Sequence, residues 1–213
     1  MLPDTIRAFF GLLNTASINY VLVKNINNEL PYALAENKDI DILVDSKEIE
    51  TVKKLILDNG FVKTIHPQSY ETGWSFAYGT SECLMFKNNE RLWVDIQCEL
   101  CLKSLMGNIL IPMDKYINEA VWSNKKWDEN NGWWITDDKT RLVYLISRCV
   151  FDKNNFSQLY INEINGYACL LNDDDVQRML GMVFFKFKNK LIEMIIKKQY
   201  NNIIDSYISF CDY

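Results

Sequence analysis

The chain has little of what several common site chemistries require. It has a single histidine, His66, in 213 residues, which argues against most triads and acid–base sites built on imidazole. Its six cysteines include one closely spaced pair, Cys98 and Cys101, and no second Cys or His pair to complete a structural zinc site. We therefore interpret the cysteines as reduced and mostly buried thiols, with a redox role for Cys98 and Cys101 as the minor alternative.

Long apolar runs and an excess of positive charge are also lacking. No run of about 18 apolar residues occurs, so we expect no membrane span. The first residues lack the basic and apolar regions of a signal peptide, and we expect a cytoplasmic protein. The net charge of −5 argues against a dominant non-specific nucleic-acid surface, although it leaves room for a local basic cleft.

The remaining composition is that of a globular chain, with 48% hydrophobic and 24% charged residues. Helical and strand patterns alternate in the first part of the chain, whereas helical spacing prevails after Asp137. We therefore predict an α+β fold. It has a mixed sheet flanked by helices in residues 1–136 and a helical domain in residues 137–213.

Local signals place most of the expected elements. Asp45 is a helix N-cap with Glu48 three residues on, a variant of the capping box, and Asn59 and Gly60 end that helix. Asn88 and Asn89 are typical of a hairpin turn. The expected helices cover 4–14, 45–59, 137–149, 156–165, 173–184 and 186–210. The expected strands cover 19–24, 39–44, 61–65, 74–78, 82–87, 91–97, 109–111 and 133–135, and 107–136 is otherwise mixed.

The expected strand from Asp39 to Val44 carries two carboxylates. Successive side chains of a strand point to opposite faces, so Asp39 and Asp41 share one face while the apolar residues between them point to the core. Two adjacent carboxylates repel each other unless a divalent cation lies between them, because hard cations prefer oxygen ligands. A solvent-facing edge strand with two acids is the alternative interpretation.

A third acid, Asp95, lies in the expected strand 91–97, where it shares a face with Trp93 and Gln97. A lone carboxylate in an apolar strand is costly unless it is paired or bound to metal. We expect this strand to be an antiparallel neighbour of the first, with the acids about 5 Å apart. Three such carboxylates would hold two Mg²⁺ ions about 4 Å apart, as in enzymes that transfer phosphoryl groups.

These segments together resemble the nucleotidyltransferase superfamily related to DNA polymerase beta. The similarity is greatest to its uncharacterised bacterial branch, whose strands read like L-K-G and D-I-D-L-L-V. Here the corresponding segments are Val21-Leu22-Val23-Lys24-Asn25, Lys38-Asp39-Ile40-Asp41-Ile42-Leu43-Val44, Asn59-Gly60-Phe61 and Trp93-Val94-Asp95-Ile96. The resemblance covers roughly residues 18–100 and fades in the helical part.

The resemblance implies an enzyme that uses Mg²⁺ or Mn²⁺. It would move a nucleoside monophosphate from an NTP such as ATP to a hydroxyl or phosphate acceptor. The acceptor would be a small molecule, a sugar or surface-polysaccharide precursor, or RNA. By resemblance, Asp39 and Asp41 bind the metals and the triphosphate, and Asp95 binds the catalytic metal and helps to deprotonate the acceptor. Lys24 and Asn25 lie at the turn that cradles phosphate.

The turn departs from the family pattern, because Asn25 stands where the family has glycine. Asparagine tolerates the left-handed conformation, so we expect the turn to persist, although its side chain obstructs the close approach of phosphate. A catalytically degenerate nucleotide-binding or interaction module is therefore the alternative function. A third alternative, a toxin-like enzyme that acts on tRNA, would need a basic surface that the composition does not show. No motif in the sequence indicates the oligomeric state.

Supporting residues carry weaker signals. Lys153, after the first helix of the second part, is expected to reach toward phosphate, with an exposed surface lysine as the alternative. Arg148 has the same two interpretations. The aromatic residues Tyr70, Trp74 and Trp93 are interpreted as stacking platforms or, more simply, as core.

Overall fold

The computed structural model describes residues 2–35, 38–64, 75–76, 83–103 and 109–212. Its helices are α1 (Leu2–Thr15), α2 (Ile49–Asp58), α3 (Lys115–Asn124), α4 (Asp138–Phe151), α5 (Gln158–Gly166), α6 (Asp174–Phe184), α7 (Lys188–Ile196) and α8 (Ile203–Ile208). The strands are β1 (Tyr20–Leu22), β2 (Asp39–Val44), β3 (Val62–Thr64), β4 (Ser75–Phe76), β5 (Cys83–Lys87), β6 (Trp93–Gln97), β7 (Cys101–Lys103), β8 (Ile109–Pro112), β9 (Lys126–Asp128) and β10 (Trp133–Ile135). Short 3₁₀ turns are η1 (Ile26–Asn28), η2 (Ser46–Glu48), η3 (Ala168–Asn172), η4 (Phe185–Phe187) and η5 (Tyr200–Asn202).

Within the described residues, seven strands form one mixed sheet in the order β3-β5-β6-β2-β1-β10-β9. Strand β2 at its centre pairs antiparallel with β1 and parallel with β6. A smaller sheet has the order β4-β8-β7. The predicted α+β class, a mixed sheet flanked by helices, is therefore confirmed.

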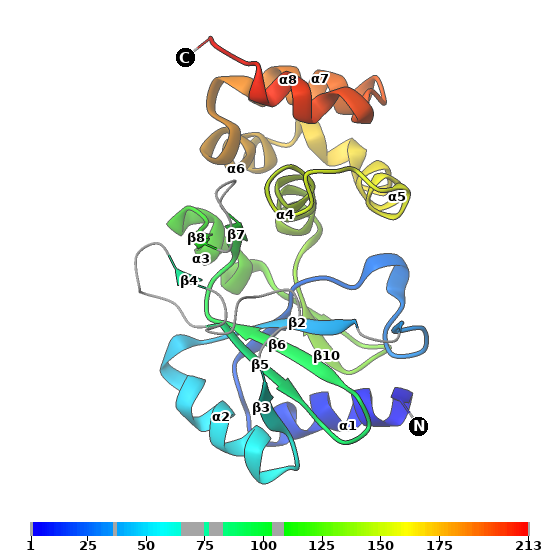
Figure 1. The fold of residues 1–213 in the computed structure, drawn as a ribbon, viewed down its shortest axis with the longest axis vertical. Coiled ribbons are helices and arrows are strands. Elements are labelled where there is room, and N and C mark those ends of the chain that lie inside the picture. Colours follow the sequence, from blue (N-terminus) through cyan, green and yellow to red (C-terminus); the bar gives the residue numbers. More distant parts are fainter. Residues whose placement is uncertain (1, 36–37, 65–74, 77–82, 104–108, 213) are drawn as a thin grey trace.

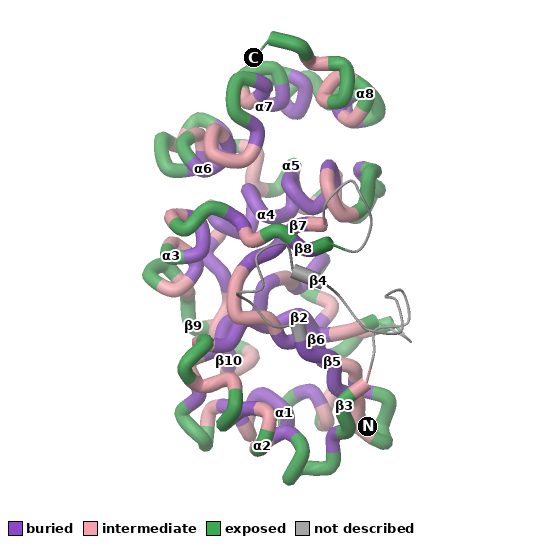
Figure 2. The backbone as a smooth tube through the Cα atoms, turned by 60° about the vertical axis from the view of Figure 1, so that its left-hand side comes forward, coloured by how far each residue is buried: buried purple, intermediate pink, exposed green. Residues whose placement is uncertain are grey.

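The large sheet separates two hydrophobic cores. On one face, Ile40, Ile42 and Val44 pack with residues of α1 and α2, as the alternation in the sequence predicts. On the other face, Val21 and Leu43 join the core of the helical part. Figure 1 shows α1 and α2 on one side of the sheet and α4 with the later helices on the opposite side. The buried segments of Figure 2 follow the central strands and α4.

The start of α2 differs in detail from the expected capping box. Asp45 accepts from the backbone N–H of Lys47 at 3.0 Å, as a capping residue does, and α2 begins at Ile49 after a 3₁₀ turn. The carboxylate of Glu48 accepts from the backbone N–H of Asn19 at 2.7 Å instead of closing the box. Gly60 ends the helix with φ +84°, a conformation that suits glycine.

Several expectations about pairing and helix length are wrong. Strand β6 is parallel to β2, not antiparallel, because the connection through α2, β3 and β5 returns the chain in the same direction. Helix α3 occupies part of the segment read as mixed, and β7 and β9 were not expected. The helix expected over 186–210 is divided into α7 and α8, with Phe185 at φ 49° and Lys198 at φ 56° at the breaks.

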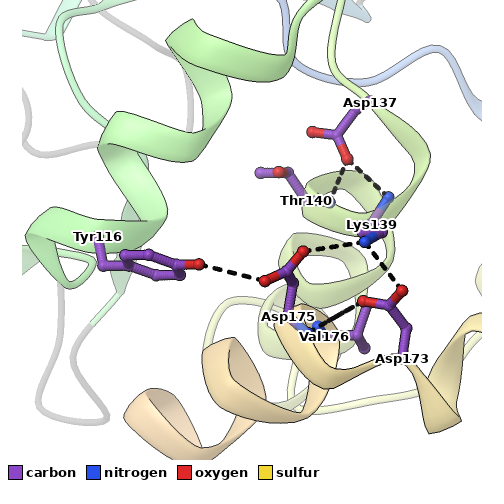
Figure 3. A network of polar contacts seen from close by, with 7 residues as sticks. All are labelled: Tyr116, Asp137, Lys139, Thr140, Asp173, Asp175 and Val176. Atoms are coloured by element: carbon purple, nitrogen blue, oxygen red, sulfur yellow. Dashed lines mark hydrogen bonds and ion pairs between the residues drawn. The ribbon is translucent and has the colours of Figure 1, made fainter.

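A polar network joins α3, α4 and α6 (Figure 3). Lys139 Nζ lies 2.8 Å from Asp173 Oδ2 and 2.9 Å from Asp175 Oδ2, and the Tyr116 hydroxyl donates to Asp175 at 3.4 Å. Asp173 also caps α6 by accepting from the N–H of Val176, and Asp137 caps α4 in the same way. The network fixes the first turn of α6 against the first turn of α4.

No helix among the described residues has the length and apolarity needed to cross a membrane. The core of the helical part includes Val21 and Leu43 of the sheet, so packing is continuous across residue 136. The division into domains at that residue stays a prediction.

Candidate metal and nucleotide site

Three aspartates meet at the centre of the sheet, on the face covered by the helical part. Asp41 of β2 is the register partner of Asp95 of β6, and Asp39 lies two residues earlier on the same face of β2. One carboxylate oxygen of each residue lies within 4.8 Å of the others. Asp41 and Asp95 are only 8% and 7% exposed. The sequence therefore predicted the meeting of these acids, although it predicted the wrong strand direction.

Positive side chains lie against Asp41, one of the two buried carboxylates. Lys24 Nζ lies 2.6 Å from Asp41 Oδ2, and Arg148 Nη1 lies 3.5 Å from Asp41 Oδ1. Burial by itself raises the pKa of the Asp41 carboxyl, but the charges of Lys24 and Arg148 outweigh it and hold that pKa below its usual value. Asp41 is therefore ionised at neutral pH.

Arg148 connects α4 to the strands. Its Nε lies 3.2 Å from Asp152 Oδ2, one helical turn later, and its Nη1 donates to the Tyr144 hydroxyl at 3.2 Å. Asp152 in turn accepts from the backbone N–H of Lys103 on β7 at 2.7 Å. The guanidinium is thus held from two sides while it faces Asp41, which fixes α4 over the acid cluster.

The turn after β1 places Lys24 at the site. Asn25 has φ −143°, so it is not left-handed as expected; Asn27 and Asn28 take that conformation instead, with φ 54° and 51°. The Asn25 side chain accepts from the N–H of Leu30 at 2.9 Å. This hydrogen bond closes the turn internally, so the Asn25 side chain oxygen is used to hold the loop.

Arg141 of α4 holds the same turn from outside. Its Nη2 donates to the carbonyl oxygen of Asn25 at 2.7 Å and lies 3.0 Å from Glu163 Oε2 on α5. Glu163 also accepts from the backbone N–H of Asn27. Helices α4 and α5 therefore determine where the turn that follows Lys24 lies.

Two further lysines belong to the same electrostatic neighbourhood. Lys153 is exposed, yet partial desolvation and the positive charges of Arg148 and Lys24 lower its pKa. Burial lowers the pKa of Lys103, and the charge of Arg148 acts in the same direction. Lys24, Arg148 and Lys153 therefore place three positive charges near Asp41, in a chain of net charge −5.

The remaining expected residues are placed as follows. His66, Tyr70 and Trp74 lie outside the described residues. Trp93 is half-buried at the start of β6, where the Lys87 ammonium lies 5.3 Å from its ring centroid.

Sequence reasoning missed the supporting roles of four residues: Tyr144, Asp152, Lys103 and Arg141. For Asp152 a signal existed, because it follows Arg148 by four positions, the spacing of neighbours on one helix face, although the helix was expected to end at residue 149. For the others, no local pattern separates them from ordinary helix or strand residues.

The donor set of the acid cluster fits a hard divalent cation. Asp39, Asp41 and Asp95 offer only carboxylate oxygens, the ligands that Mg²⁺ and Mn²⁺ prefer, and they present them within one small space. No other group of three or more such ligands occurs in the part of the chain that the structure describes.

No protein-family model matches the chain, and no curated protein matches its sequence. The solved structures that are similar in shape include the following three. A lincomycin-bound lincosamide antibiotic adenylyltransferase matches with a TM-score of 0.46 and 12% identity, over 77% of this chain and 94% of the other. ANT(2'')-Ia in complex with adenylyl-2''-tobramycin matches with a TM-score of 0.49 and 8% identity, over 92% of this chain and 97% of the other. An antigenic nucleotidyltransferase-like protein from Paracoccidioides brasiliensis matches with a TM-score of 0.46 and 10% identity, over 96% of this chain and 92% of the other.

Proposed function

We propose that the protein is a metal-dependent nucleotidyltransferase, which moves a nucleoside monophosphate from an NTP to the hydroxyl or phosphate of a small molecule. The observation that carries the proposal is the cluster of Asp39, Asp41 and Asp95, with one oxygen of each within 4.8 Å of the others. Basic side chains of α4 and of the turn after β1 lie against Asp41 of this cluster, and a highly charged triphosphate requires such positive charge.

Each residue has a defined task in the transfer. Mg²⁺, held by the three aspartates, would neutralise charge on the phosphates and on the attacking and leaving oxygens. The acceptor oxygen forms a bond to the α-phosphorus while the bond to the bridging oxygen breaks, and pyrophosphate leaves with that electron pair. Asp95 takes the acceptor proton. Lys24 and Lys153 bind the phosphates of the donor, and Arg148 keeps Asp41 ionised and in place.

The acceptor belongs to the same proposal at a finer level. The matched adenylyltransferases carry lincomycin and an adenylylated tobramycin, both small molecules. We infer a small hydroxyl-bearing acceptor, with a sugar or surface-polysaccharide precursor as one such class, in preference to RNA. The donor base and the cytoplasmic location stay predictions.

The test measures pyrophosphate release from each of four radiolabelled NTPs with Mg²⁺ and a panel of acceptors, for the wild type and for Asp39→Ala and Asp41→Ala. We expect release from the wild type with at least one acceptor and none above background from the variants. Equal signals from all three proteins would contradict the proposal.

A catalytically degenerate nucleotide-binding or interaction module is the second candidate. Two observations favour it: Lys24 and Arg148 already neutralise Asp41, and Asn25 replaces the family glycine. Calorimetry with ATP, CTP, GTP and UTP in the presence of Mg²⁺ separates the two functions. Metal-dependent binding without turnover on any acceptor supports the module, whereas turnover supports the enzyme.

A further inference from the structure

Lys24 lies where it competes with a cation for the acid cluster. Its Nζ is 2.6 Å from Asp41 Oδ2, and its side chain is only 17% exposed. Asp41 is also one of the three residues whose oxygens converge. A positive ammonium at this distance repels a divalent ion and uses a carboxylate oxygen that the ion needs, in surroundings where water screens the repulsion poorly.

The two positive partners of Asp41 differ in how firmly they are held. Arg148 is anchored by Asp152 at 3.2 Å and by the Tyr144 hydroxyl at 3.2 Å, and it stands farther from Asp41, at 3.5 Å. Lysine carries a compact charge on a flexible four-carbon stem, and it can exchange one oxygen partner for another by rotation. Lys24 is therefore the displaceable partner, and Arg148 is the permanent one.

The site also offers a reason for Lys24 to leave Asp41. Lys153 adds positive charge near Asp41, and burial together with the charges of Arg148 and Lys24 lowers the pKa of this lysine. Lys153, Arg148 and Lys24 are thus positive charges held near one another, and an anion such as a triphosphate would relieve their repulsion. An anion bound there is within the electrostatic influence of Lys24 as well.

We propose that Lys24 is an internal counter-cation that keeps the acid cluster from binding a divalent metal until the triphosphate of a nucleotide draws its ammonium away. This inference rests on the proposed function and adds a rule to it: metal and nucleotide bind together, each raising the affinity of the other. Such coupling is reciprocal, so it is measurable from either ligand.

The test titrates Mn²⁺ into metal-free protein, followed by electron paramagnetic resonance, with and without a non-hydrolysable NTP. Without nucleotide, we expect Lys24→Met to bind Mn²⁺ about tenfold more tightly than the wild type, because the competing charge is gone. With nucleotide, the affinity of the wild type for Mn²⁺ rises by about tenfold or more, whereas that of Lys24→Met changes much less.

The matched control is Lys38→Met. Lys38 precedes Asp39 directly, but its ammonium lies 2.9 Å from Glu29 Oε2 and its side chain is 46% exposed. This variant removes the same charge from the same strand region without removing the contact to Asp41. We expect it to bind Mn²⁺ as the wild type does, which would exclude a general effect of net charge.

A second variant and a second readout cover the case in which Lys24→Met folds poorly. Lys24→Gln is neutral and polar, and the rise of its Tm on adding Mn²⁺ without nucleotide should exceed the rise in the wild type. Mn²⁺ binding that is equal in the wild type and both Lys24 variants, and lost in Asp41→Asn, overturns the inference but leaves the metal site standing. Absence of binding in every protein, even with nucleotide, overturns both the inference and the proposed function.

Discussion

Arg148 of α4 and Asp41 of β2 form an ion pair, with 3.5 Å between Nη1 and Oδ1, that joins the helical part of the chain to the central strand of the sheet. The arginine is 9% exposed and the aspartate 8%. The pair therefore has two consequences. It maintains the charge of a proposed metal ligand, and it ties together the two cores on either side of the sheet.

Arg148→Met is expected to destabilise the fold. The substitution leaves Asp41 and Asp152 with one positive partner fewer in a buried site, and the free energy of unfolding should fall by about 3 kcal/mol. Urea denaturation measures it. The control is Arg178→Met, because Arg178 is exposed and contacts the ring of Tyr116. A loss for Arg148→Met no greater than that of the control would contradict the assigned role.

Arg141→Met should loosen the turn that follows Lys24. It removes the donor to the Asn25 carbonyl and the partner of Glu163. Loss of one hydrogen bond to a charged group costs about 1.5 kcal/mol, which corresponds to about tenfold faster hydrogen exchange at residues 25–28. Hydrogen–deuterium exchange with mass spectrometry measures this, and exchange in β9 should stay unchanged. Equal protection of the turn in variant and wild type would show that α4 does not hold it.

The network around Lys139 should stabilise the protein in a pH-dependent manner. The hydrogen bond from Lys139 lowers the pKa of Asp173. The folded state therefore binds the proton of this carboxyl less readily than the unfolded state. Its contribution is present above the ordinary pKa of an aspartate and is lost as the pH falls through the lowered value.

Lys139→Met should accordingly lower the Tm slightly at pH 7 and leave it unchanged near pH 2. The effect at pH 7 should shrink in high salt, because these groups are close to the surface. Differential scanning calorimetry across this pH range checks the prediction, with Lys54→Met at an exposed position of α2 as the surface control. A difference in Tm that persists unchanged at low pH would contradict it.

Four of the six cysteines should fall into two classes of reactivity. Cys149 is buried and burial raises its pKa to about 12, and the same holds for Cys101. Cys169 and Cys211 are exposed. At pH 8, iodoacetamide should modify the exposed pair within minutes and the buried pair only in denaturant, because the thiolate is the reactive form. Peptide mapping by mass spectrometry reads the result; rapid native labelling of Cys149 would contradict the packing of α4.

The sequence predicted the structure best where polar and apolar side chains alternate every second residue along a strand. Alternation along β2 and β6 was enough to predict which faces carry the acids and which face the core, because each strand has one face packed on α1 and α2. The direction of β6 relative to β2 was not readable, since it depends on how many strands the chain adds between them. The three acids converge whether β6 is parallel or antiparallel to β2, so the error in strand direction does not change the predicted site.

Other errors have local physical causes. Residues 115–124 form a helix behind an Asp114 cap, whereas the segment 107–136 was expected to be mixed and no helix was predicted there. The break between α6 and α7 occurs at Phe185, which takes φ 49°. Because this residue is neither glycine nor proline, its type does not indicate a break. Arg148 and Arg141 act through partners more than 20 positions away, and only the packed structure brings these together.

The central claim is that Asp39, Asp41 and Asp95 together hold divalent cations beside a bound nucleotide. Anomalous diffraction from crystals grown with Mn²⁺ and a non-hydrolysable NTP tests it most directly. We predict anomalous peaks between these three carboxylates and the phosphates. A nucleotide-bound crystal whose anomalous peaks all lie elsewhere, with Lys24 still paired to Asp41, would contradict it.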